Sequence, residues 1–159
     1  MIYLASDHGG YHAKAIVKKM LERESIEHKD LGPHTLQTDD DYPDYILPLA
    51  LRVAKEDAKG IISCRNGQGA AIIANKVPGI RAAVCSNEAC AKSSRNDDNA
   101  NILSLPADYL TEAEIETIVK DWLETPFSHD ARHLRRIHKI RDFEQSSPER
   151  SDALQERGR

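Results

Sequence analysis

The chain has 159 residues, of which 40% are hydrophobic and 30% charged, and its formal net charge is −4. This composition is that of an ordinary globular protein, and the length suits one domain with a sizeable core. The acidic balance argues against a nucleic-acid-binding protein, and no apolar run is long enough to span a bilayer.

The N-terminus and the cysteines indicate the compartment. Residues 2–5 have the pattern of a strand, without the basic segment and cleavage site of a signal peptide. Three cysteines are an odd number, which does not fit a disulfide framework. We therefore expect a cytoplasmic protein.

Short apolar runs alternate along the chain with segments whose apolar residues recur at helical spacing. Pro43 stands near the start of one such segment, and Thr111 with Glu114 has the pattern of a capping box at the start of another. In chain order we expect a strand at 2–6, a helix at 11–24, a strand at 26–31, a helix at 44–58, a strand at 60–63, a helix at 69–76, a strand at 81–85, a helix at 87–96, a strand at 102–105, and helices at 111–123 and 129–145.

Strands that alternate with helices predict an α/β protein with a parallel sheet. We expect a Rossmann-like three-layer sandwich with a five-stranded parallel sheet, formed by residues 1–145. From Ser146 onward the chain is polar and has no apolar periodicity, which predicts a disordered tail over residues 146–159.

Cys64 stands where an apolar run becomes a glycine-containing turn, residues 65–69. Free backbone N–H groups and the positive end of a helix lower the pKa of a thiol and stabilise an anion. Such a thiol could abstract a carbon-bound proton while the turn binds the oxyanion that forms. The alternative interpretation is a small buried hydrophobic residue before a common Asn-Gly turn.

Asp7 and His8 follow the first expected strand, at the sheet edge where ligands bind in such folds. Asp7 could hold a ligand hydroxyl group, and His8 could contact a ring oxygen or a phosphate. Alternatively, Asp7 caps the following helix.

The polar segment from Ser93 to Asn101 forms either one wall of a site or a solvated helix end. Because it precedes a strand, we expect it at the amino edge of the sheet, away from Cys64 of the same subunit. If both serve one site, a partner subunit must supply one of them.

The last expected helix carries a basic cluster that could clamp a phosphate, or could simply form a solvated face. No basic stripe extends beyond it, so nucleic acid is not supported as a partner. Cys85 and Cys90 lack the spacing of a zinc site, and residues 39–41 lack the ligand pattern of a calcium loop. We expect no metal. The cluster consists of Arg132, Arg135, Arg136 and Lys139.

Taken together, these motifs resemble the type B ribose-5-phosphate isomerases, in the superfamily that includes the galactose-6-phosphate isomerase subunits. The resemblance extends over residues 1 to about 145 and rests on several motifs in the same order. The motifs are Ser6–Gly10, Asp41–Pro43, Gly60–Cys64, Gly67–Gly69, Ile73–Lys76, Pro78–Ala82, Ser94–Arg95, Asn99–Leu103 and Arg132–His133 with Arg136.

The resemblance implies an enzyme that interconverts D-ribose 5-phosphate and D-ribulose 5-phosphate through a cis-enediol, without cofactor or metal. It also implies a homodimer or a dimer of dimers with shared active sites, and a C-terminal helix used in dimerisation. An isomerase of allose 6-phosphate or another hexose phosphate is one alternative. A sugar-phosphate-binding protein without turnover is another.

The resemblance also implies roles for individual residues. Cys64 would move a proton between C1 and C2, and residues 65–69 would form the anion hole through their backbone N–H groups. Asp97 is the second catalytic candidate. The substrate-binding candidates are Asp7, His8, Tyr42, Arg65, Asn66, Gly67, Gln68, Gly69 and Asp98, with Arg132 and Arg136 holding the phosphate.

Three positions depart from the family's pattern. Asp97 stands where many members carry a ring-opening histidine, and a carboxylate of ordinary pKa, about 3.9, rarely donates a proton at neutral pH, so that His8 is a substitute. Asp108 lies where a phosphate-binding arginine often follows the fifth strand, which leaves the clamp to the last helix. Arg65 replaces a usual glycine beside Cys64, where it could depress the pKa of the thiol, bind an anion or point to solvent.

Overall fold

The computed structural model describes residues 1–146 of the chain. They divide into two units, one formed by residues 1–127 and a second that begins at Ser128. The part of the expected tail from residue 147 onward lies outside the described residues. Within residues 1–146, every helix is too short or too polar to cross a membrane.

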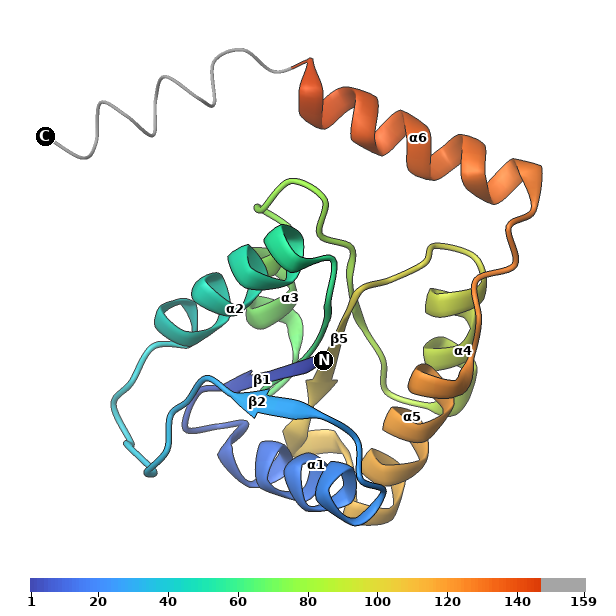
Figure 1. Ribbon diagram of the computed structural model, residues 1–159. Coiled ribbons are helices and arrows are strands. Elements are labelled where there is room, and N and C mark those ends of the chain that lie inside the picture. The colour runs from blue at the N-terminus through green and yellow to red at the C-terminus, as the bar shows by residue number, and fades with distance from the viewer. Residues whose placement is uncertain (147–159) are drawn as a thin grey trace, which may run out of the picture. The chain divides into compact units, whose positions relative to one another are not determined.

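The first unit is built on five short parallel strands in the order β2-β1-β3-β5-β4 (Figure 1). The three central strands are buried along almost their whole length, because helices cover both faces of the sheet. The strands are β1 (Ile2–Ser6), β2 (His28–Asp30), β3 (Lys59–Cys64), β4 (Ala82–Val84) and β5 (Ile102–Pro106).

Helices form the two outer layers of the first unit. One face of the sheet is covered by α2 (Tyr42–Glu56) and α3 (Gln68–Ala74), and the other by α1 (Tyr11–Arg23), α4 (Glu88–Asn96) and α5 (Glu112–Glu124), as can be followed in Figure 1. The structure confirms the α/β three-layer fold predicted from the sequence.

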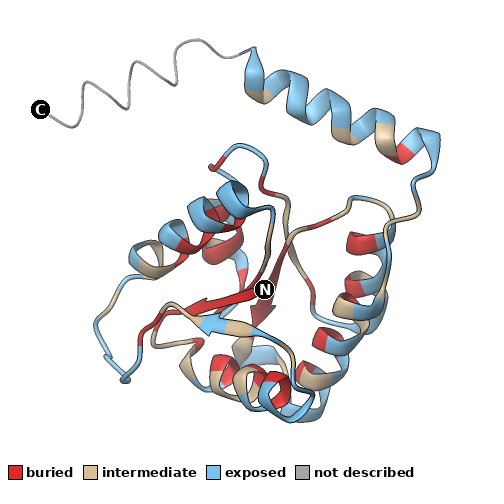
Figure 2. Ribbon diagram, in the orientation of Figure 1, coloured by how far each residue is buried: buried red, intermediate tan, exposed pale blue. Residues whose placement is uncertain are grey.

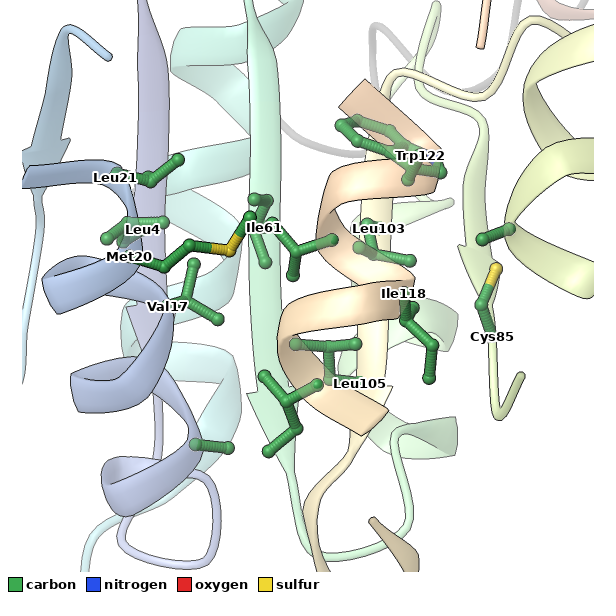
Figure 3. Packing of buried hydrophobic residues seen from close by; sticks show 14 of the residues in the cluster. Leu4, Val17, Met20, Leu21, Ile61, Cys85, Leu103, Leu105, Ile118 and Trp122 are labelled. Carbon is green, nitrogen blue, oxygen red and sulfur yellow. The ribbon is translucent and has the colours of Figure 1, made fainter. Parts of the chain in front are cut away.

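Neighbouring residues of the strands point into different cores, as a strand's period of two requires. Leu4 packs with α1 and α5 (Figure 3), whereas Tyr3 and Ala5 pack with α2 and α3. Trp122 of α5 is fully buried in the same core as Leu4. Red segments in Figure 2 mark the buried strands and the inner faces of the helices. Full burial of one large apolar side chain stabilises a fold by about 1.5–3 kcal/mol.

Several element boundaries differ from those expected. α2 begins at Tyr42 instead of Asp44, because Pro43 fits the first turn of a helix. The second unit contains α6 (Ala131–Gln145), which begins two residues later than expected because His129 has a φ of 58°. A short 3₁₀ turn, η1 (Ala107–Tyr109), follows β5 and was not expected.

The capping box of α5 is present as the sequence predicts. The Thr111 hydroxyl oxygen accepts the Glu114 N–H at 3.3 Å, and the Glu114 carboxylate accepts the Thr111 N–H at 2.7 Å. These bonds also hold the pKa of Glu114 below its usual value. The helix that buries Trp122 is thereby stabilised at its first turn.

Replacement of Thr111 by Ala should lower the free energy of unfolding by about 1 kcal/mol, because it removes the N-cap acceptor. Urea unfolding followed by circular dichroism measures the difference. Thr117→Ala is the control, since Thr117 is an exposed residue inside the same helix whose hydroxyl only bonds the Ala113 carbonyl. Equal loss in both variants would contradict the capping role.

Candidate active site

The carboxyl ends of the three central strands lie side by side. Ser6 of β1 pairs with Ser63 of β3, and Cys64 pairs with Pro106 of β5. The loops that follow these strands therefore share one edge of the sheet, which is the edge where open α/β sheets bind ligands.

Cys64 is the last residue of β3 and is only 4% exposed. It is a free thiol on the sheet face that α2 and α3 cover. Its sulfur lies 4.0 Å from Oδ1 of Asn66, and the same oxygen accepts the Gln68 N–H at 3.0 Å. The thiol thus faces a turn that the Asn66 side chain closes.

The turn after Cys64 needs glycine for two reasons. Gly67 has a φ of +73°, and a Cβ at this position would lie 3.1 Å from the Pro106 nitrogen. The Gly67 carbonyl also accepts the Ser104 hydroxyl at 2.7 Å. The end of β5 therefore fixes the shape of the turn beside the thiol.

Tyr42 lies against the same turn. A Cβ added to Gly69 would stand 2.7 Å from Cζ of Tyr42, so the phenol ring packs on the glycine backbone. The structure thus brings Tyr42, from the start of α2, next to the turn that follows Cys64.

The Asp7–Gly10 loop packs closely against the end of β3 and is hydrogen-bonded to it. Gly10 approaches so closely that a Cβ would lie 2.2 Å from the Ser63 carbonyl oxygen, and the Ser63 hydroxyl donates to the Gly10 carbonyl at 2.9 Å. Asp7 is 5% exposed and accepts the Gly10 N–H at 2.9 Å. Burial raises the pKa of this carboxyl group, so Asp7 is a stronger base than an exposed aspartate.

His8 is held by a residue that the sequence analysis did not select. Oδ1 of Asp40 lies 2.8 Å from the His8 backbone nitrogen and 2.7 Å from its Nδ1. The hydrogen bond to Asp40 raises the pKa of His8 above its usual value. Asp40 is 32 residues away along the chain, and its acidic neighbours give no signal of this contact.

Arg65 and Asp108, which both differ from the pattern of the family that the sequence resembles, form an ion pair with each other. Nε of Arg65 lies 3.1 Å from Oδ2 of Asp108, and the Asp108 N–H donates to the Arg65 carbonyl at 2.8 Å. A Cβ on Gly9 would meet Cγ of Arg65 at 2.3 Å, so the arginine stem crosses the Asp7–Gly10 loop. The negative charge of Asp108 is thus compensated at the same edge.

Asp97 and Asp98 are not brought to this edge. They lie at the end of α4, in the segment that leads into β5. In this segment the Asn101 carbonyl accepts the Gly60 N–H at 2.9 Å, which places the segment near the start of β3. Cys64 lies four residues further along that strand, about 13 Å away. The topological prediction that the polar segment and Cys64 lie at opposite edges is confirmed for a single chain.

The remaining two candidates, Arg132 and Arg136, belong to the second unit. Both lie on α6, are exposed and are separated by four residues, so they share one face of the helix. Arg132 is 3.8 Å from Asp130.

Among the hollows on the first unit, two bear on the choice of site. One of about 370 Å³ adjoins the turn after Cys64 and is lined by Asn66, Gln68, Val84, Ser86, Pro106 and Tyr109. Another of about 700 Å³ lies between α1 and α5, and carboxylates dominate its lining. The position beside the turn after Cys64 therefore favours the hollow of about 370 Å³. Residues 1–146 contain no group of three His, Cys, Asp or Glu side chains arranged to hold a metal ion.

The sequence of the chain matches that of a known family. The sequence model of the family described as ribose/galactose isomerase matches residues 2–140. The chain belongs to the ribose/galactose isomerase family. This finding confirms the resemblance predicted from the motifs.

Relatives within the ribose/galactose isomerase family cover nearly the whole chain. The probable ribose-5-phosphate isomerase B of Mycoplasma genitalium is 39% identical over 92% of this chain and 97% of its own. The ribose-5-phosphate isomerase B of Mycolicibacterium paratuberculosis is 36% identical over 91% of this chain and 92% of its own.

Solved structures of the family agree with the fold. Ribose-5-phosphate isomerase B from Clostridium thermocellum superposes with a TM-score of 0.87 at 40% identity, covering 91% of this chain and 97% of that chain. The Mycoplasma genitalium protein was solved with bound ribulose-5-phosphate and has a TM-score of 0.88 at 38% identity, with coverages of 92% and 97%.

Gly67→Ala should lower the free energy of unfolding by more than about 1 kcal/mol, since an Ala at positive φ is strained. Gly79→Ala is the matched control, because Gly79 has a φ of +81° but open space where a Cβ would stand. The excess loss in Gly67→Ala measures the close approach to β5. Equal losses in chemical unfolding would mean that backbone strain alone requires the glycine.

Proposed function

We propose that this protein is an aldose–ketose isomerase that interconverts D-ribose 5-phosphate and D-ribulose 5-phosphate. The observation that carries the proposal is the Mycoplasma genitalium structure with bound ribulose-5-phosphate, which is similar over 92% of this chain. The free thiol at the end of β3 supplies a group suited to the proton transfer.

Cys64 is the proposed base. Its thiolate takes the proton from C2 of the open-chain aldose, and the electron pair of the broken C–H bond forms the C1–C2 double bond of the enediolate. The negative charge moves to the oxygen on C1, where N–H groups of residues 65–69 stabilise it. A proton passes from the hydroxyl group on C2 to the oxygen on C1, and return of the proton from Cys64 to C1 then gives the C2 ketone. The reaction is therefore neutral overall and needs no external oxidant.

The other two cysteines are less suited to this role. Burial raises the pKa of Cys85 to about 11, which keeps it a neutral thiol at pH 7. Cys90 lies in the first turn of α4, which follows the edge strand β4, and not at the end of a central strand. Position and chemistry both support Cys64.

The substrate is held by polar groups from several elements. Asp7 and His8 contact the sugar, with Tyr42 and residues 65–69 lining the pocket. Arg132 and Arg136 hold the phosphate, a role that suits guanidinium groups because they bind phosphate bidentately.

A homodimer, alone or paired as a dimer of dimers, is the proposed working form, with sites shared between subunits. Asp97 and Asp98 of one protomer would serve the Cys64 of its partner, because the two groups lie at opposite edges of one sheet. The last helix, α6, would contribute to dimerisation, and its exposed Ile140 and Phe143 suit such a contact. The three free cysteines fit a cytoplasmic location.

Cys64→Ala should abolish isomerisation while leaving the fold intact, because it removes only the proton carrier. Proton NMR of ribose 5-phosphate in deuterated buffer should show ribulose 5-phosphate and loss of the C2 proton signal with the wild type, and neither with the variant. Cys90→Ala, the control, should retain wild-type turnover.

Unchanged turnover in Cys64→Ala would overturn the thiol base. Absence of wild-type turnover despite saturable binding of ribose 5-phosphate would instead favour a hexose phosphate substrate or a protein that only binds sugar phosphates.

Mixing two inactive variants tests the shared site. Cys64→Ala and Asp97→Ala should each be inactive alone, whereas mixed dimers would contain one intact site. After subunit exchange, roughly a quarter of the wild-type rate should return, since half of the dimers are mixed and each has one good site. Activity that does not return on mixing would contradict a site built from both subunits.

A further inference from the structure

A buried carboxylate stands behind His8 and has no role in the function proposed so far. Asp40 lies in the segment between β2 and α2, and its side chain is 5% exposed. One of its oxygens lies within 2.8 Å of both the backbone nitrogen and Nδ1 of the same histidine.

This double contact determines how the imidazole ring can act. A carboxylate oxygen only accepts hydrogen bonds, so Nδ1 of His8 must carry a proton. The ring is held through Nδ1, and Nε2 on the opposite side is the nitrogen left for a substrate. The side chain of His8 is 34% exposed, so Nε2 can exchange protons with water.

The charges around His8 favour its protonated form. The hydrogen bond to Asp40 raises its pKa most; burial lowers the pKa by less than this hydrogen bond raises it, and the charges of Asp7 and Asp40 raise it further. Tyr45 packs beside Asp40, and burial together with Asp40 and Asp44 raises the pKa of its phenol, so it remains neutral at pH 7. The groups that face His8 thus leave it a proton to donate.

The loop places His8 near the proposed base. Gly9 lies against Arg65 and Gly10 against Ser63, the residues on either side of Cys64. His8 and Cys64 therefore share the carboxyl edge, whereas Asp97 of the same chain lies at the other edge.

We propose that Asp40 is a positioning residue that holds His8 as the acid for opening the sugar ring, before Cys64 acts. The proposal rests on the proposed isomerase function and deepens it. In the step, Asp97 of the partner subunit takes the proton of the anomeric hydroxyl group, the C1–O1 double bond forms and the bond from C1 to the ring oxygen breaks. Nε2–H of His8 gives its proton to the ring oxygen, and both side chains recover their charge states by exchange with water.

Two reactions separate ring opening from the proton transfer at carbon. Isomerisation of ribose 5-phosphate requires ring opening, because this aldose is a cyclic furanose. Exchange of the C1 proton of ribulose 5-phosphate with deuterated water does not require it, because a ketose phosphorylated at C5 cannot close a five-membered ring. A defect confined to the first reaction identifies ring opening.

Asp40→Asn and Asp40→Ala are the test variants, and Asp39→Asn, which changes an exposed neighbour, is the control. Asp40→Asn keeps the shape and removes the charge, and Asp40→Ala removes the acceptor. Both should slow isomerisation of ribose 5-phosphate by roughly ten- to a hundredfold, with the larger loss in Asp40→Ala, and leave the exchange of ribulose 5-phosphate within about twofold of the wild type. Asp39→Asn should leave both unchanged.

The pH dependence gives a second readout. His8 must be protonated to donate, so the isomerisation rate falls as pH rises through its pKa. Because Asp40 raises that pKa, Asp40→Asn should move this alkaline limb to lower pH. NMR titration of the His8 imidazole, assigned with His8→Gln, should show the same direction.

Equal loss of both reactions would overturn the proposal in favour of a purely structural role, and so would an unchanged rate or an unchanged His8 titration. If the wild type catalyses neither reaction, the proposed function fails. In that case the His8 titration in Asp40→Asn still decides whether Asp40 controls the imidazole.

Discussion

The close approach of the Asp7–Gly10 loop to the end of β3 is the contact on which the site depends. A side chain at Gly10 would run into the Ser63 carbonyl, so only glycine lets the two backbones meet. The parallel register of Ser6 with Ser63 brings them to the same height. Asp7, His8 and Cys64 belong to loops and strand ends that meet at one edge of the sheet because this contact exists.

Local patterns were sufficient to predict most of the fold. Strands such as β3 and helices such as α5 have strong periodicity and clear end signals, including the capping box at Thr111. Boundaries were less predictable: α6 starts later because His129 adopts a left-handed backbone conformation, which no composition rule signals for a histidine.

The candidate site was predictable where its residues belong to one loop and not where they meet across the fold. Cys64 and its turn are contiguous, so their chemistry can be inferred from spacing. The contact of Asp40 with His8 and that of Arg65 with Asp108 join residues 32 and 43 positions apart. Such pairs arise from tertiary packing, and an acid run such as residues 39–41 looks like a solvated loop until the structure places it.

Because of the distance between the two edges of the sheet, the activity of the enzyme should depend on the concentration of the protein. Cys64 and the segment that includes Asp97 are separated by the length of β3, so one chain cannot supply both to one substrate. With the shared sites proposed above, turnover is a property of the assembled pair. The activity per chain would then fall on dilution below the dissociation constant of the dimer.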